Sequence, residues 1–270
     1  MSREFLSRYT SLGVGGAADV TIVKNTDDLC YKRGDTVIGR GTNVLVSDDG
    51  VLGRVLVMRN TGTEWRGMRA VAESGTPLAA LAKEACMRGA RGLEWATGIP
   101  GSLGGAIVMN AGAYGGETGV IVDWVTVLTE YGEVTVGRQT LRFGYRSVTG
   151  LPEGVILRAG LAFSQGNAQE LNEASAAYDA KRRASQPTGR SAGSTFRRAD
   201  GVGAGYYIEK AGLKGFSVGG ARVSEKHANF IIADGASASD CRELIDTVKL
   251  EVYARTGVKL REEIKYIGEF

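Results

Sequence analysis

The sequence predicts an α+β fold in two parts. Short apolar runs separated by glycine turns fill the first 163 residues, which is typical of β-strands, whereas the longest amphipathic helical patterns lie after them. Glycine accounts for 40 residues and proline for only 4, a balance that suits tight turns and close backbone approaches. We therefore expect one domain over residues 1–163, with two subdomains that divide near residue 59, and a smaller α+β domain over residues 164–270.

The first domain is predicted to hold strands around one helix. Pro77–Met87 has the helical pattern, because Leu78 and Leu81 begin an apolar repeat at i, i+3, i+4 and i+7. Pro77 suits the first helical position, and Gly89 suits the end. Apolar runs bounded by turn residues predict strands at 20–23, 36–38, 43–46, 54–58, 120–128, 133–136 and 154–163.

Two helices are predicted in the second domain. Ala168–Ser185 is amphipathic and ends in three basic residues, where the helix dipole favours cations. Ser239–Arg255 is the clearer helix, because an apolar stripe runs from Leu244 to Val252 and Gly257 lies just beyond its end. The first of these helices is followed by a polar loop over residues 186–191.

Composition favours a cytoplasmic, soluble protein. Hydrophobic residues make up 43% of the chain and charged residues 23%, which is ordinary for a globular domain. The net charge of +3 is too small to indicate a nucleic-acid partner. We expect no membrane partner, because the start of the chain lacks a secretory segment and no apolar run approaches a membrane span. Three scattered cysteines and one histidine argue against a metal site and predict buried thiols in a reducing compartment.

Two glycine-rich segments are candidate ligand sites. Residues 98–116 hold seven glycines, which indicates either a run of tight turns or a backbone surface laid against a flat ligand. Gly39-Arg-Gly-Thr-Asn43 lies between two predicted strands, where consecutive N–H groups could form a nest for a phosphate oxygen. Taken alone, that segment is better explained by a plain β-turn. It is not a P-loop, because no Gly-Lys-Ser/Thr follows.

Single residues carry less information than these segments. Ser194 stands in a Ser/Gly loop, where serine is usually a turn or cap residue. Ser194 is not the central serine of a G-x-S-x-G motif and has no nearby histidine in the sequence, which argues against its use in a Ser-His-Asp hydrolase. Arg146 and Glu263 are, by default, solvated surface groups.

The order of motifs along the chain carries a resemblance. In this order the chain resembles the UDP-N-acetylenolpyruvoylglucosamine reductase family, and within it the compact subgroup that lacks a tyrosine-bearing lid. The matching segments span nearly the whole chain and lie at 10–19, 39–48, 98–116, 143–147, 191–197, 211–215, 226–230 and 257–264.

The resemblance implies a flavoenzyme of peptidoglycan precursor synthesis. FAD would bind noncovalently in residues 1–163, in a two-lobed fold of the vanillyl-alcohol-oxidase type, and residues 164–270 would bind the substrate. NADPH would reduce the flavin, and UDP-N-acetylglucosamine enolpyruvate would then be reduced to UDP-N-acetylmuramate. The family further implies a monomer. Two alternatives stay open: an oxidase of small alcohols with the same flavin fold, and a nucleotide-binding homologue without reductase activity, suggested by the short segment 24–36.

The resemblance also assigns roles to single residues. Ser194 would donate a proton to the substrate carbon, while Arg146 and Glu263 would flank the enolpyruvyl carboxylate. Glu262 competes with Glu263, which we choose because it precedes Ile264. His227 is expected to be structural. The implied cofactor-binding residues are Gly39, Arg40, Gly41, Thr42, Asn43, Gly98, Gly101, Ser102, Gly104, Gly105, Asn110, Gly112 and Ala113. The implied substrate-binding residues are Tyr145, Arg197, Lys214 and Asn229.

Overall fold

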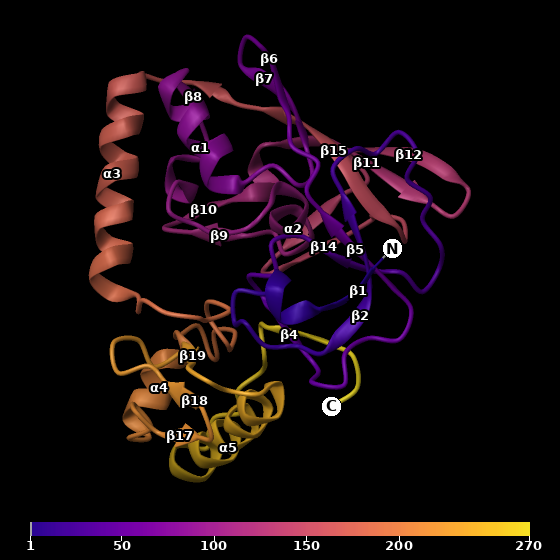
Figure 1. Cartoon of the computed structure of the whole chain (residues 1–270). Helices are drawn as coiled ribbons and strands as arrows, with labels where there is room; N and C mark the ends of the chain where they lie inside the picture. The colour runs from indigo at the N-terminus through magenta and orange to yellow at the C-terminus, as the bar shows by residue number, and fades with distance from the viewer. Residues whose placement is uncertain (1) are drawn as a thin grey trace. The chain divides into compact units, whose positions relative to one another are not determined.

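The chain forms two compact units, each assembled from separated segments (Figure 1). The computed structural model describes residues 2–270. The terminal unit holds the residues up to Val20, Gly41–Arg54 and Arg183–Phe270, and the central unit holds Thr21–Arg40 and Val55–Arg182. This division by contacts is not linear along the chain. The domain boundary near residue 163 stays a prediction, because compactness does not say which ligand each part binds.

A five-stranded antiparallel sheet forms the core of the central unit. Its strand order is β12-β11-β15-β7-β6. Buried and exposed residues alternate along β7, so Ala70 and Ala72 face the core that they share with Leu78 and Leu81 of α1. The bounds are β6 Thr63–Arg66, β7 Arg69–Glu73, β11 Val122–Thr129, β12 Gly132–Gly137, β15 Val155–Ala162 and α1 Leu78–Met87.

Short elements complete the central unit around this sheet. Two of them are the hairpins β9–β10 and β13–β14, which lie in segments that the sequence marks as candidate sites. The bounds are β3 Thr36–Ile38, β5 Arg54–Met58, β8 Ala90–Arg91, α2 Leu103–Val108, β9 Gly112–Ala113, β10 Gly116–Glu117, β13 Arg142–Gly144, β14 Ser147–Thr149 and β16 Ser164–Gln165, with 3-10 turns at Glu94–Ala96 and Thr118–Val120.

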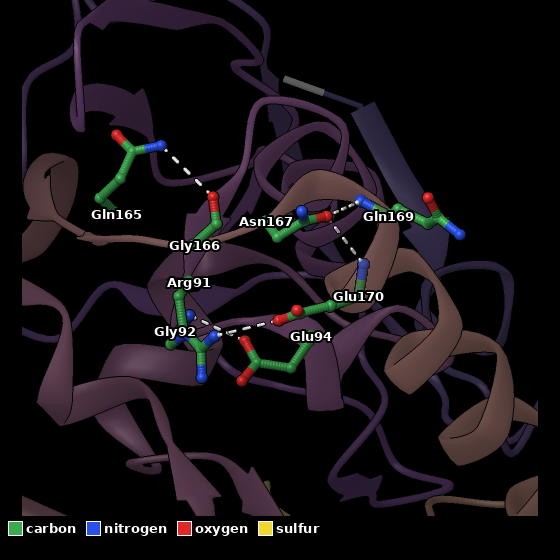
Figure 2. A network of polar contacts seen from close by, with 8 residues as sticks. All are labelled: Arg91, Gly92, Glu94, Gln165, Gly166, Asn167, Gln169 and Glu170. Carbon is green, nitrogen blue, oxygen red and sulfur yellow. Dashed lines mark hydrogen bonds and ion pairs between the residues drawn. The ribbon is translucent and has the colours of Figure 1, made fainter.

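The long helix α3, Ala168–Ser185, begins at a polar network (Figure 2). The side chain of Asn167 accepts hydrogen bonds from the backbone N–H groups of Gln169 and Glu170, at 2.8 and 3.2 Å. These two groups belong to the first turn of the helix, where backbone donors have no helical partner. The Glu170 carboxylate lies 3.8 Å from the guanidinium of Arg91 on β8. The network therefore fixes where α3 begins.

The terminal unit packs two helices against a small sheet. β17, β18 and β19 form an antiparallel sheet in that order, with α4 and α5 beside it (Figure 1). β20 at the end of the chain pairs in parallel with β4, and β1 pairs with β2. The bounds are β1 Ser2–Phe5, β2 Ala17–Val23, β4 Val44–Val46, α4 Ala204–Lys210, β17 Ser217–Val218, β18 Ala221–Val223, β19 Ile231–Ala233, α5 Ala238–Thr256 and β20 Lys265–Ile267, with a 3-10 turn at Leu6–Tyr9.

Both ends of α5 are capped. Ser237 and Asp240 form a reciprocal capping box at its start. The Asp48 carboxylate accepts further hydrogen bonds from the N–H groups of Ala238 and Ser239, each at 2.8 Å. Gly257 ends the helix in the left-handed conformation, with a φ of 73°.

Most of the predicted elements are present. The α+β class, the seven strands and the helices are confirmed within a few residues, and the apolar stripe of α5 is buried. Pro77 is a correction: it is the N-cap of α1, with an extended ψ of 122°, and not its first helical residue. Cys86 and Cys241 are buried as expected, but Cys30 is exposed. No helix within residues 2–270 combines the length and the apolar character that crossing a lipid bilayer requires.

Candidate active site

The segment that carries Ser194 is held on two sides in the terminal unit. On one side the Thr195 N–H donates to the Asn229 carbonyl at 2.8 Å, and Ser194 forms a β-bridge with Phe230. On the other side the Glu263 N–H donates to the Thr195 carbonyl at 2.8 Å. Ser194 itself is half-buried. The structure therefore brings the backbones of two predicted catalytic residues together.

Glu263 is buried, and its backbone is fixed by the predicted phosphate turn. Its side chain is only 8% exposed. The Asn43 side-chain amide donates to the Glu263 carbonyl at 3.2 Å, while the Asn43 carbonyl accepts from the Lys265 N–H at 3.0 Å. Glu262 points its carboxylate to Lys249 of α5 instead, at 2.7 Å. Of the two adjacent glutamates, Glu262 is thus engaged in an ion pair with a helix, and Glu263 is enclosed beside the Ser194 segment.

Arg146 occupies a strained backbone position in the central unit. Gly144 pairs with Ser147 across the β13–β14 hairpin, so Tyr145 and Arg146 form its two-residue turn. Arg146 has a φ of 53°. A left-handed conformation at the second turn residue normally selects glycine or asparagine, because a Cβ atom is crowded there. Such strain persists where the surroundings impose it, and it concentrates at functional sites.

The side chain of Asn110 anchors that turn. It is 1% exposed, and its Nδ2 donates to the Gly144 carbonyl and to the Glu117 carboxylate, each at 3.0 Å. Its Oδ1 accepts from the Gly119 N–H at 2.9 Å. The sequence motif predicts Asn110 as a cofactor-binding residue. It does not single out Glu117, since an acidic residue in a glycine hairpin carries no signal of this contact.

For most glycines of residues 98–116, the surrounding protein explains why the residue is glycine. A Cβ atom on Gly104 would lie 3.0 Å from the Ser74 Cβ, and one on Gly116 would lie 2.1 Å from the Trp95 ring. Gly105 differs. It is exposed in α2, and the nearest atom to its Cβ position would be the Ser102 Oγ at an ordinary 3.5 Å. Glycine inside a helix is destabilising relative to alanine. No contact within the described chain accounts for glycine at this position.

Two segments predicted to bind the cofactor are adjacent in the central unit. A Cβ atom on Gly39 would lie 2.3 Å from the Ser102 Oγ, so the turn after β3 packs directly on the start of α2. Arg40 beside it is exposed. Gly41 belongs to the terminal unit, where its carbonyl accepts from the Ser11 N–H at 2.9 Å. The remaining predicted cofactor residues are Thr42, which is half-buried, Gly98, which is exposed, and Gly101, Gly112 and Ala113, which are half-buried.

The other predicted substrate residues differ in their surroundings. Tyr145 is 50% exposed. Arg197 is half-buried, and its N–H donates to the Arg261 carbonyl at 2.9 Å. Lys214 pairs with Glu209 at 2.7 Å. Burial lowers the pKa of the neighbouring His227 imidazole, and the charge of Lys214 lowers it further.

Comparisons with known proteins match both parts of the chain. The family described as "UDP-N-acetylenolpyruvoylglucosamine reductase, C-terminal domain" matches residues 185–267, and "FAD binding domain" matches residues 13–137. The UDP-N-acetylenolpyruvoylglucosamine reductase of Caldanaerobacter subterraneus subsp. tengcongensis is 42% identical, with 98% of this chain and 93% of the relative covered. That of Heliobacterium modesticaldum is 40% identical, covering 100% of this chain and 91% of the relative.

A solved structure agrees in fold. The crystal structure of UDP-N-acetylenolpyruvylglucosamine reductase from Thermus caldophilus superimposes with a TM-score of 0.88 at 34% identity. The match covers 99% of this chain and 98% of that one. Relatives above 30% identity over almost the entire length share the fold and the family. The chain therefore belongs to the UDP-N-acetylenolpyruvoylglucosamine reductase family and is an FAD-dependent oxidoreductase.

Proposed function

We propose that this chain reduces UDP-N-acetylglucosamine enolpyruvate to UDP-N-acetylmuramate, with NADPH as the hydride donor, in peptidoglycan precursor synthesis. The observation that carries the proposal is the end-to-end match to proteins named as this reductase, at 42% identity over 98% of the chain. The match of residues 13–137 to an FAD-binding family supports retention of the cofactor. The substrate is thus a small UDP-sugar.

The residues present fit noncovalent FAD. Gly105 leaves an open, exposed patch of helix backbone, and Gly39 brings the predicted phosphate turn against the start of that helix. The chain's one histidine, His227, lies outside residues 13–137, the segment that matches the FAD-binding family, which argues against its use as a covalent flavin attachment point. When bound, FAD supplies hydride transfer between NADPH and the substrate.

Arg146 and Glu263 are proposed to act on the enolpyruvyl group. Hydride addition to the terminal enol carbon leaves negative charge on the neighbouring carbon and on the carboxylate next to it. A guanidinium held by a strained turn can offset that charge through forked hydrogen bonds. Glu263, buried beside the Ser194 segment, can donate to the same group when protonated. Tyr145, Arg197 and Lys214 are proposed to bind the rest of the substrate.

Ser194 is proposed to complete the reaction by donating its hydroxyl proton to the carbon that carries the charge. Serine is a weak acid, so the step depends on a strongly basic carbon and on nearby cations that stabilise the alkoxide. Arg197, three residues on and half-buried, is a candidate for that role.

One experiment tests the function directly. Purified protein reconstituted with FAD is mixed with NADPH, with or without the enolpyruvyl substrate. We expect NADPH consumption to continue beyond the reduction of the bound flavin only when substrate is present, and we expect formation of UDP-N-acetylmuramate, detected by mass spectrometry. A protein that stays colourless after incubation with FAD would support the homologue without reductase activity. Turnover of small alcohols with oxygen, in place of NADPH-dependent reduction, would support the oxidase.

The monomeric state and the cytoplasmic location remain predictions. Light scattering coupled to size-exclusion chromatography would measure the first, and fractionation of cells that express the chain would measure the second.

A further inference from the structure

We infer that Asn229 is a positioning residue that fixes the backbone beside Ser194, and not a ligand of the substrate. The inference rests on the proposed role of Ser194. The motif Lys226-His227-Ala-Asn229-Phe230 predicts substrate binding by Asn229. The contacts of its side chain assign it a different task.

The Asn229 side chain pairs with one residue in the manner of a neighbouring strand. Its Oδ1 accepts from the Phe196 N–H at 3.0 Å, and its Nδ2 donates to the Phe196 carbonyl at 2.8 Å. A carboxamide offers the same donor and acceptor as a peptide group. The side chain therefore satisfies both backbone groups of Phe196, two residues after Ser194.

The backbone of Asn229 is itself held in place. Its N–H donates to the Nδ1 of His227 at 3.2 Å, and its carbonyl accepts from the Thr195 N–H at 2.8 Å. Three hydrogen bonds thus join Asn229 to the two residues that follow Ser194. On the opposite edge, Thr195 is bonded by Glu263. Loss of the amide would remove the two bonds to Phe196 and leave, on this side, the backbone bond from the Thr195 N–H and the Ser194–Phe230 bridge.

Burial argues against direct contact with a substrate. Asn229 is 6% exposed, and its two amide atoms are already engaged with Phe196. A substrate group would have to displace these bonds and leave buried backbone groups unpaired, which is costly. A shift of Ser194 by about 1 Å would be enough to slow proton delivery by roughly 10²-fold. The amide is therefore expected to affect catalysis through the placement of Ser194.

The test is a double-mutant cycle in the half-reaction where substrate reoxidises the reduced enzyme. The variants are Asn229→Ala, Ser194→Ala and both together, measured by stopped flow on FAD-loaded protein. We expect Asn229→Ala to slow reoxidation by roughly 10²-fold, while NADPH reduces the enzyme at the normal rate. The double variant should be close to Ser194→Ala alone, because Asn229 acts through Ser194. The matched control is Asn172→Ala, which removes an exposed carboxamide on α3.

Binding measurements separate the two roles of Asn229. Substrate affinity, read from the perturbed flavin absorbance, should change less than about threefold in Asn229→Ala, since positioning acts on the rate. A large loss of affinity, with effects that multiply in the double variant, would overturn the inference and restore a substrate ligand. A wild-type rate in Asn229→Ala beside a slow Ser194→Ala would overturn it too. A wild-type rate in Ser194→Ala would instead remove the proposed role of Ser194, and the inference with it.

A second variant guards against a folding defect. Asn229→Asp preserves the shape and, when protonated, offers the same donor and acceptor pair as the amide. Its reoxidation rate relative to wild type should therefore be higher at pH 5.5 than at pH 8. Thermal unfolding and FAD retention are measured alongside. A relative rate independent of pH in a folded, FAD-loaded protein would contradict the role of this hydrogen-bond pair.

Discussion

Arg146 combines a side chain with a proposed role in the reaction and an unfavourable backbone conformation. Its φ of 53° places the Cβ atom where L-residues lose roughly 1–2 kcal/mol. Glycine would relieve that crowding but would also remove the guanidinium. The residue thus offers a way to separate folding from function.

We predict that Arg146→Gly is more stable than Arg146→Ala by about 1 kcal/mol, because only alanine keeps the Cβ atom. Both variants should slow reoxidation by substrate equally, by roughly 10²–10³-fold, since both lack the guanidinium. Urea unfolding and stopped-flow kinetics measure the two effects. Reduction by NADPH serves as the control, and an equal loss there would point to a damaged fold.

Replacing Ser194 should lower the activity of the enzyme without disturbing its fold. Ser194→Ala removes the proton and little volume, so FAD binding and NADPH reduction should be unchanged. Positioned proton transfer contributes about 10²–10⁴-fold to a rate, so reoxidation by substrate should slow by at least about 10²-fold. Ser194→Cys should retain part of the rate, because a thiol carries a transferable proton. Wild-type reoxidation by Ser194→Ala would show that the proton comes from water or Glu263.

Helix α2 holds two adjacent glycines, Gly104 and Gly105, and the contacts around them differ. Gly104 packs on Ser74, whereas a Cβ atom on Gly105 would meet only the Ser102 Oγ, at an ordinary distance. We predict that Gly105→Ala raises the stability of the FAD-free protein by about 0.5–1 kcal/mol, because alanine is the better helix former. FAD affinity should fall, since the methyl group enters the patch that the flavin would cover. Gly105→Val should weaken binding further.

Gly104→Ala is the matched control for α2. It should destabilise the FAD-free protein, because the added Cβ atom would lie 3.0 Å from the Ser74 Cβ. Calorimetry of FAD-free protein and fluorescence titration with FAD give the two quantities. Unchanged FAD affinity in Gly105→Val would remove this part of α2 from the cofactor site.

The turn over residues 224–230 predicts a pH effect. Burial lowers the pKa of His227 below its usual 6.5, and its Nδ1 accepts from the Asn229 N–H, which requires the neutral ring. The unfolded chain therefore binds the proton more tightly than the folded one. The stabilisation is complete above pH 6.5 and is lost as the pH falls through the folded pKa. As the chain has one histidine, its NMR signal measures this pKa without assignment. His227→Gln should show a smaller loss of stability below pH 6.5.

Elements with a strong local pattern are predictable from sequence, and those fixed by distant contacts are not. The stripe of α5 and its terminal glycine identify that helix from sequence alone. The pattern does not reveal α2, because Leu-Gly-Gly-Ala-Ile-Val has poor helix propensity and depends on packing against Ser74. It does not reveal the β6–β7 hairpin either. Motif order identifies the candidate residues, but it cannot show that the Asn110 and Asn229 amides are engaged with backbone groups.

The division into two units predicts whether a fragment of the chain can fold and bind FAD. A fragment of residues 1–163 would match the predicted FAD-binding domain, yet it would lack the C-terminal residues that complete the terminal unit. In particular, β4 would lose its pairing with β20. We predict that this fragment is poorly folded and binds FAD far more weakly than the full chain. Circular dichroism and FAD titration test this, with residues 1–270 as the control. Cooperative unfolding of the fragment with normal FAD affinity would establish the linear boundary.

The pairing of β4 with β20 also has a consequence during synthesis on the ribosome. β4 leaves the ribosome long before Lys265–Ile267, its partner strand, is translated. The apolar strand Val44–Val46 therefore stays unpaired while the residues between the two strands are made, and unpaired strand edges are prone to aggregate. Chaperones that cover nascent chains should matter more for the yield of this protein than for its catalytic rate. Substitutions in Lys265–Ile267 should accordingly lower the amount of soluble enzyme in the cell while the molecules that do fold remain fully active.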